Sequence, residues 1–267
     1  MTRAERGFVP QVLVVPAVVG LALLVVPLAA LVGRVRWETL WQDVTAPAAL
    51  EALALSMRTG LIATALCILL GVPLALLIAR AGNRTAAVLR ALVTIPLVLP
   101  PMVGGVALLF LFGRSGWLGP ALEDVGISIP FTTTAVVLAQ TFVALPFLVL
   151  ALEASLRSTG VGYEQAAASL GAGRWRILTR VTLPLAAPGL VAGVVLCFAR
   201  AVGEFGATAL FAGNAPGVTQ TMPLAIYSAF NGAGVSQGTA VALSLLLLGT
   251  AVTVLLLVRA WRPGAAR

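Results

Sequence analysis

The sequence predicts an all-α integral membrane protein, a single transmembrane domain over residues 1–267 with six membrane-spanning helices. Hydrophobic residues make up 60% of the chain and charged residues 10%, whereas a soluble domain carries about 25% charged residues. The mean hydropathy is +1.06. Several uncharged runs are long enough to cross the roughly 30 Å hydrocarbon core of a bilayer, because a helix rises about 1.5 Å per residue.

The expected spans lie at about residues 11–33, 57–80, 90–113, 132–154, 187–211 and 238–259. Arg3 and Arg6 precede the first span, as they would in a signal peptide. Its uncharged run exceeds the roughly 7 to 15 residues of a signal core, so we interpret it as a retained helix. Prolines inside the spans, such as Pro73, are acceptable because neighbouring helices can satisfy the freed backbone groups.

The third span contains an irregular stretch, residues 96–105, that is rich in proline and glycine. These residues weaken the helical hydrogen-bond ladder and let backbones approach each other. Irregular backbone at membrane depth is tolerated where it is buried in protein or lines a cavity. Two interpretations of Pro100, Pro101 and Gly104 therefore stand: part of a translocation path, or a kink with close helix packing.

A water-side loop, residues 157–184, joins the fourth and fifth spans. It holds a short, alanine-rich helix from Glu164 to Leu170, a helix-stopping Gly171 and then three arginines, Arg174, Arg176 and Arg180. A helix of about seven residues does not persist alone in water, so it needs a surface to dock on. The loop is therefore a candidate docking element for another protein, and the alternative is an ordinary amphipathic connection.

The fifth span carries two ionisable residues, Arg200 and Glu204. Arg200 lies about 12 residues beyond Pro188, which is roughly 18 Å along a regular helix. An ionisable group at that depth is expected to face the interior of the bundle. The spacing of the two residues lets them pair along one helix face. The pair is either a structural link to neighbouring helices or part of a gate.

Arginine placement predicts the topology, since all 17 positive residues are arginines. Most gather before the first span, between spans two and three, between spans four and five, and after the sixth. The loop after the first span is mixed, with Arg34 and Arg36 set against Glu38, Asp43 and Glu51. The loop over residues 114–130 has one arginine, and the loop over residues 212–237 has no charge. The positive-inside rule then places both termini and the 157–184 loop in the cytoplasm. The net charge of +8 follows from this topology and gives no support to a nucleic-acid partner.

The residue types that are missing exclude most enzyme classes. The chain has no lysine, which a phosphate-binding ATP loop requires, and no histidine for zinc motifs or Ser-His dyads. Its two aspartates, Asp43 and Asp124, lie outside the spans, and Cys67 and Cys197 sit within spans without a partner base. We expect a conduit rather than an enzyme, with no metal or cofactor bound by this chain.

The water-side loop resembles the cytoplasmic EAA loop of bacterial ABC-importer permeases. The family pattern is Glu-Ala-Ala, about three residues, Gly, about nine residues, Ile, any residue, Leu-Pro. Val181 stands here for Ile, and Gln165 stands for Glu, with Glu164 one place upstream. In the family this loop is the coupling helix, which lies in a groove of the ATPase. The resemblance implies ATPase-coupling roles for Glu164, Gln165, Ala166, Ala167, Gly171, Leu183 and Pro184.

A second stretch, Ala199 to Tyr227, is similar to the molybdate and tungstate branch of these oxyanion permeases. That branch has Gly-Glu-Phe-Gly-Ala-Thr, then Gly-Asn, a Pro-Gly turn and Thr-Gln-Thr before Pro-Leu-Ala-Ile-Tyr, and the same residues stand here at 203–208, 213–214, 216–217, 219–221 and 223–227. Sulfate and thiosulfate permeases share the Gly-Glu-aromatic-Gly element but match less well over residues 219–227. The Pro96–Pro101 break and the water-side loop share in this resemblance. Each of the three motifs alone is weak, but the three in this order are specific, and the similarity extends over nearly the whole chain.

The resemblance implies a type I ABC-importer permease in the inner (plasma) membrane with a short cytoplasmic coupling helix. Its expected partners are a second copy of the chain, two cytoplasmic ATPase subunits that hold ATP and magnesium, and a periplasmic or lipid-anchored oxyanion-binding protein. Molybdate or tungstate is the expected substrate. A tetrahedral oxyanion presents only acceptor oxygens, so donors such as hydroxyls suit its path. The candidate path and gate residues are Pro100, Pro101, Gly104, Arg200, Glu204, Thr208, Thr219, Gln220 and Thr221.

Two alternatives remain at this point. One is a sulfate or thiosulfate permease, because these oxyanions differ little from molybdate in shape and charge. The other is an ATP-independent anion channel or secondary transporter. That class is expected to show inverted repeats and ion-coupling acids within the spans, yet no such repeat is evident and Glu204 is the only clear acid within a predicted span.

Overall fold

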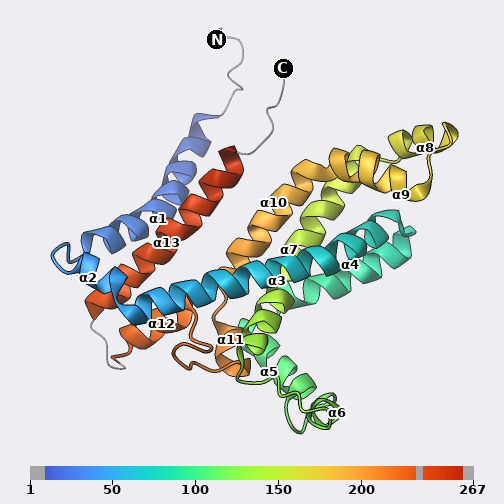
Figure 1. The fold of residues 1–267 in the computed structure, drawn as a ribbon. Helices are drawn as coiled ribbons and strands as arrows, with labels where there is room; N and C mark the ends of the chain where they lie inside the picture. Colours follow the sequence, from blue (N-terminus) through green and yellow to red (C-terminus); the bar gives the residue numbers. More distant parts are fainter. Residues whose placement is uncertain (1–9, 233–236, 261–267) are drawn as a thin grey trace.

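The computed structural model describes residues 10–232 and 237–260, which form helices joined by turns (Figure 1). No strand occurs in these two ranges, so the predicted all-α class is confirmed. The elements are η2 (Gln11–Leu13), α1 (Val14–Gly33), α2 (Leu40–Thr45), α3 (Pro47–Arg80), α4 (Asn83–Val98), α5 (Pro101–Phe112), α6 (Gly119–Glu123), α7 (Thr133–Thr159), α8 (Gly162–Ser169), α9 (Arg174–Ile177), the π-helical turn η3 (Leu178–Thr182), α10 (Leu183–Val202), α11 (Gly206–Phe211), α12 (Met222–Phe230) and α13 (Gln237–Ala260).

Among the described residues, four helices are long and apolar enough to cross a membrane. They are α1, α3, α7 and the 29-residue run Arg174–Val202, in which α9, η3 and α10 follow one another without a gap. The pair α4 and α5, bent by 110°, makes a fifth span if it is counted as one. In α13 the apolar stretch Gly238–Val254 is shorter. Each predicted span falls on one or more of these helices, and the count of six crossings stays a prediction.

Several helices differ in length from the predicted spans. Helix α3 starts at Pro47, because proline fits the first turn of a helix and Ala46 before it is extended. The helix that contains α10 starts at Arg174 and ends at Val202. The predicted span 187–211 is therefore divided between α10 and α11. Residues 222–230 form α12, so the expectation of a loop throughout residues 212–237 is wrong.

Helix α7 is the centre of the bundle. It packs against α3 and α10, and also touches α4, α5 and α11. Small buried residues such as Ala139 and Ala144 let these helices approach closely. Cys67 of α3 and Cys197 of α10 lie in one buried cluster against α7, and both thiols are free.

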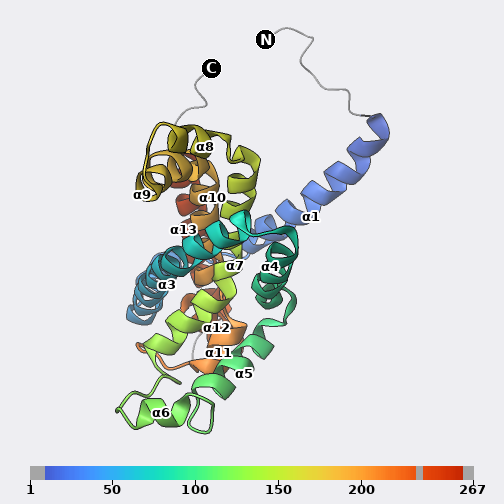
Figure 2. The same cartoon turned by 90° about the vertical axis from the view of Figure 1, so that its right-hand side faces the viewer.

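The two ends of the bundle hold different elements. The beginning of α1 and the last turns of α13 lie at the same end as α8 and α9, whereas α6 and α12 lie at the other end (Figures 1 and 2). The pair α4 and α5 carries the chain from the α8 end to the α6 end. Helix α1 has no buried residue, so its apolar surface is left for lipid or another chain.

Candidate functional site

The loop that joins α7 to α10, residues 160–182, stands out at one end of the bundle and is called the α8 loop below (Figure 1). Helix α8 occurs where the short helix was predicted. Gly171 follows it with a φ of +82°, a left-handed conformation that favours glycine. The N–H groups of Gly171 and Ala172 donate to the carbonyls of Ala168 and Ala167, which is the Schellman pattern of helix ends. The predicted helix stop at Gly171 is confirmed.

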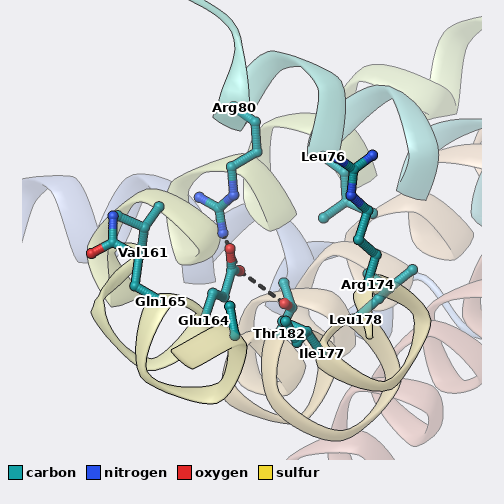
Figure 3. A pocket seen from close by; sticks show the side chains of 10 residues that line it. Leu76, Arg80, Val161, Glu164, Gln165, Arg174, Ile177, Leu178 and Thr182 are labelled. Atoms are coloured by element: carbon teal, nitrogen blue, oxygen red, sulfur yellow. Dashed lines mark hydrogen bonds and ion pairs between the residues drawn. The ribbon is translucent and has the colours of Figure 1, made fainter. Parts of the chain in front are cut away.

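Glu164 ties the α8 loop to two other helices. Its carboxylate is ion-paired with Arg80 at the end of α3 and accepts a hydrogen bond from the Thr182 hydroxyl in η3 at 2.8 Å (Figure 3). The Glu164 and Arg80 side chains are 21% and 30% exposed. The carboxylate thus points into the protein, and it links α8 to the ends of α3 and α10.

The α8 loop has an inner and an outer face. Glu164 points inward, and with the exposed Gln165 and Ala168 it lines an open hollow of about 470 Å³. The other lining residues are Leu76, Arg80, Val161, Arg174, Ile177, Leu178 and Thr182 (Figure 3). On the outer face, Tyr163 is 65% exposed and Leu170 is 89% exposed, and Ala166 lies between them. Ala167 is half-buried, and Leu183 and Pro184 begin α10.

Sequence reasoning missed Tyr163 and Leu170 as candidate contact residues, because the loop pattern concerns small residues and Gly171. The spacing of these residues along a helix is a signal that could have identified them. Residues 163, 166 and 170 fall on one face of a helix, so the two large side chains form the outer surface of α8.

The second candidate region is the α10–α11 break, residues 203–205, between two buried helix ends. Glu204 is 1% exposed. Its Oε2 lies 2.5 Å from the Arg200 guanidinium, and its Oε1 accepts a hydrogen bond from the Ala207 N–H at 2.7 Å. The predicted Arg200–Glu204 pair is confirmed, although Glu204 lies beyond the end of α10 rather than on the same helix. The carboxylate also satisfies an N–H group in the first turn of α11.

Helix α5 packs against α11 through glycine. A Cβ atom on Gly206 would lie 2.9 Å from the Pro101 Cβ, and one on Gly105 would lie 2.8 Å from the Ala207 carbonyl oxygen. The ring of Phe142 covers Gly104. Pro100 and Pro101 nevertheless remain exposed, although the Pro101 Cβ borders Gly206. Close packing of the backbone therefore occurs at this bend, as one of the two sequence interpretations expected.

The polar residues predicted for the path divide into two groups. Thr208, Thr219 and Thr221 are fully buried. The Thr219 hydroxyl accepts from the Ala215 N–H at 2.9 Å, whereas the Thr208 and Thr221 hydroxyls have no hydrogen-bond partner within the described part of the chain. Gln220 is half-buried and donates to the Asn214 side chain at 3.0 Å. Of these four, Gln220 is the one that reaches the surface in this conformation.

Acidic side chains occur where the sequence did not predict them. Glu153 lies inside α7, 3% exposed, and pairs with Arg90 of α4 at 2.5 Å and Arg157 at 2.8 Å. The expectation that Glu204 is the only acid within a span is therefore wrong. The four-residue spacing of Glu153 and Arg157 is a signal that could have revealed the link.

Glu51 of α3 also lies beside Gly217, so an acidic group borders the 212–221 segment.

In each of these two regions a glutamate ties helix ends together. Across residues 10–232 and 237–260, no group of acidic or cysteine side chains is placed to hold a metal ion. The α8 loop presents an apolar outer face and an inner carboxylate that joins α3 to α10. The α10–α11 break joins three helix ends around one buried ion pair and two glycines.

Comparison with known proteins places the chain in a family. Residues 71–262 match the binding-protein-dependent transport system inner membrane component. The molybdenum transport system permease protein ModB of Mycobacterium tuberculosis is 51% identical over 95% of both chains. ModB of Escherichia coli is 41% identical over 71% of this chain and 83% of its own length. A sulfate transport system permease protein, CysW of Synechococcus elongatus, is 39% identical over 67% of this chain and 63% of its own length.

Solved structures share the fold. A bacterial ABC transporter that imports alginate matches with a TM-score of 0.69 at 16% identity, over 96% of this chain and 95% of that chain. The inward-facing MetNI methionine ABC transporter matches with a TM-score of 0.61 at 22% identity, over 79% of this chain and 94% of that chain. The chain therefore belongs to the inner membrane components of binding-protein-dependent transport systems, the permeases of ABC importers.

Proposed function

We propose that this chain is the permease subunit of an ATP-driven importer for molybdate, with tungstate as a close substitute. The observation that carries the substrate is the 51% identity with molybdenum transport permeases over 95% of both chains. The chain forms the translocation path and is not itself an enzyme, and ATP and magnesium bind to a separate ATPase subunit. Both termini and the α8 loop face the cytoplasm, in agreement with the distribution of arginine.

The α8 loop is the contact with the ATPase. Its outer face offers Tyr163 and Leu170, two large apolar groups exposed at the tip of a projecting loop. Large exposed apolar groups of this kind are typical of partner surfaces. A force on α8 passes through Glu164 to Arg80 of α3 and to Thr182 before α10. These contacts support α8 as the coupling element.

Two copies of the chain enclose the path, and a binding protein delivers the anion at the opposite, α12 end. The exposed Asn214 and half-buried Gln220 side chains lie in the 212–221 segment and supply amide groups there. Helix α11 packs on α5 directly after the α10–α11 break. A change in that packing is the step that opens or closes the path.

The decisive experiment measures ATP hydrolysis by the assembled transporter in liposomes, made with its ATPase and its binding protein. Binding protein loaded with molybdate, tungstate or sulfate is added in turn, and unloaded binding protein is the control. We expect stimulation by molybdate or tungstate and little by sulfate. A preference for sulfate would move the chain to the sulfate class, to which CysW belongs. Failure to form a complex with any ATPase would overturn the importer assignment.

A charge on the outer face of α8 tests the coupling role. Leu170→Glu places a carboxylate where an apolar contact is expected, so we expect at least a tenfold loss of co-purified ATPase. The matched control is Val125→Glu, the same kind of change at an exposed position, 68% accessible, near α6 at the other end of the bundle. Equal ATPase recovery from the two variants would contradict a docking role for α8.

A further inference from the structure

The inner side of the α8 loop has a feature that the coupling role does not use. It is the hollow of about 470 Å³ between the end of α3, the α8 loop and the start of the helix that leads into α10 (Figure 3). Leu76, Val161, Ile177 and Leu178 give it apolar walls. Arg80, Gln165 and Arg174 supply hydrogen-bond donors, and Glu164 partly neutralises Arg80. Within the described residues, the Arg174 side chain has no hydrogen bond or ion pair. The hollow is thus amphipathic, with one available cation.

The lengths of the lining helices place this hollow at the depth of lipid headgroups. The run Arg174–Val202 has 29 residues and α3 has 34. At about 1.5 Å per residue they are roughly 43 Å and 51 Å long, whereas the hydrocarbon core measures about 30 Å. Both helices are therefore longer than the hydrocarbon core, and the arginines at the start of the Arg174–Val202 run and at the end of α3 indicate that these ends extend beyond it. Trp175 is 76% exposed beside Arg174, and tryptophan is enriched at membrane interfaces.

The charge at this depth is positive. Arg174, Arg176 and Arg180 are all exposed, and Glu164 is the one acidic side chain that lines the hollow. Basic side chains next to the cytoplasmic leaflet attract anionic lipids by about 1 kcal/mol each. The outer face of α8, with Tyr163 and Leu170, points away from the hollow, so an ATPase and a lipid can occupy the two faces at the same time.

From this geometry we propose that the hollow is a binding site for an anionic phospholipid of the cytoplasmic leaflet. The lipid phosphate is held by Arg174, and Arg80, which lies between Arg174 and Gln165, adds positive charge beside it (Figure 3). The upper part of an acyl chain lies against Leu76, Ile177 and Leu178. The lipid fills the space between α8 and α3 and so supports the Glu164 link from its open side. The assignment to the cytoplasmic leaflet rests on the topology given in the proposed function. The preference for an anionic headgroup with an acyl chain rests on the residues that line the hollow.

Quenching of Trp175 fluorescence by brominated lipid tests the site. The full-length chain is placed in phosphatidylcholine vesicles without ATPase or binding protein, and brominated phosphatidylglycerol or brominated phosphatidylcholine is added. Subtracting the signal of Trp175→Phe isolates Trp175. We expect half-maximal quenching at a several-fold lower content of phosphatidylglycerol than of phosphatidylcholine. Equal quenching by the two lipids would overturn the proposal. This comparison keeps every residue that lines the hollow, so it does not depend on whether a variant of the hollow folds.

A pair of arginine variants then locates the site. Arg174→Gln should raise the half-maximal phosphatidylglycerol content about fivefold, the equivalent of about 1 kcal/mol. The control is Arg84→Gln, the same change at an exposed arginine at the start of α4 that does not line the hollow. Equal shifts in the two variants would mean a diffuse surface attraction and would overturn the site.

Two competitors identify the occupant. Inorganic phosphate at millimolar concentration should not reverse the quenching, and full reversal would assign the hollow to a free anion. The ATPase subunit should leave the quenching in place, and its loss would assign the hollow to the ATPase. The quenching assay involves no transport, so failure of the lipid site and failure of molybdate-stimulated ATP hydrolysis are separate results.

Discussion

The α8 loop and the α10–α11 break each depend on one glutamate, but the two glutamates work in different surroundings. Glu164 is 21% exposed and joins residues far away in the sequence, Arg80 and Thr182. Glu204 is 1% exposed and joins its own neighbours, Arg200 and Ala207. An exposed ion pair contributes about 0–1 kcal/mol, whereas breaking a buried one costs about 3–5 kcal/mol. The Glu164–Arg80 ion pair can therefore break and re-form at a small cost in free energy, whereas the buried Glu204–Arg200 pair stays formed.

The largest effect is expected for Glu204→Ala. The change leaves the Arg200 charge without its partner and the first turn of α11 without its carboxylate acceptor, so we expect a loss of about 3–5 kcal/mol in stability. Thermal unfolding in mild detergent measures it. The control is Glu123→Ala, which breaks the exposed pair with Arg114 and should change little.

A double variant separates a structural role of the Arg200–Glu204 pair from a gating role. Arg200→Met with Glu204→Gln removes both charges, and we expect most of the lost stability to return. Molybdate-stimulated ATP hydrolysis should return with it. A stable double variant without that activity would contradict the structural role and make the pair a gate.

A smaller effect is expected where α5 meets α11. Gly206→Ala would place a Cβ 2.9 Å from Pro101, so the helices must separate at a cost of about 1–3 kcal/mol. Gly173→Ala in the α8 loop is the matched control, since it has a φ of −70° and nothing within 4 Å of the new Cβ. Unfolding temperatures of the two variants give the comparison. Equal stability would mean that the α5–α11 contact is as adaptable as the α8 loop.

The smallest effect on stability is expected for Glu164→Gln, below about 1 kcal/mol, because the pair with Arg80 is partly exposed. Its effect on coupling should be larger: ATP hydrolysis should continue while its stimulation by loaded binding protein falls several-fold. Glu164→Asp keeps the charge on a shorter side chain and should retain more of the stimulation. Normal stimulation in Glu164→Gln would show that α8 transmits force without this link.

The two regions also differ in how far the sequence could predict them. The α8 helix and its stop at Gly171 follow from local signals, so both were predicted. The Glu164–Arg80 link was not, because it joins residues 84 positions apart and depends on how α3 and α8 pack. Glu153 was missed for the same reason: its partner Arg90 is on another helix, 63 positions away.

At the α10–α11 break the ion pair was predicted from the sequence, but the end of the helix was not. The spacing of Arg200 and Glu204 predicted the ion pair, but the largely apolar segment from residue 187 to 211 was interpreted as one continuous span. The end at Val202 depends on tertiary contacts, since Gly206 packs on Pro101 and Glu204 accepts from the Ala207 N–H. The burial of Thr208, Thr219 and Thr221 depends in the same way on packing that no short motif records.

The burial of Cys67 and Cys197 has a practical consequence for testing these ideas. Both thiols lie in the cluster between α3, α7 and α10, with 0% exposure, and the sequence contains no lysine. A water-soluble maleimide therefore finds almost nothing to modify in the native chain. A single cysteine placed at Leu170 on the outer face of α8, or at Ala168 in the hollow, becomes a nearly background-free reporter. The rate at which each thiol is alkylated would reveal when a partner covers one face and leaves the other open.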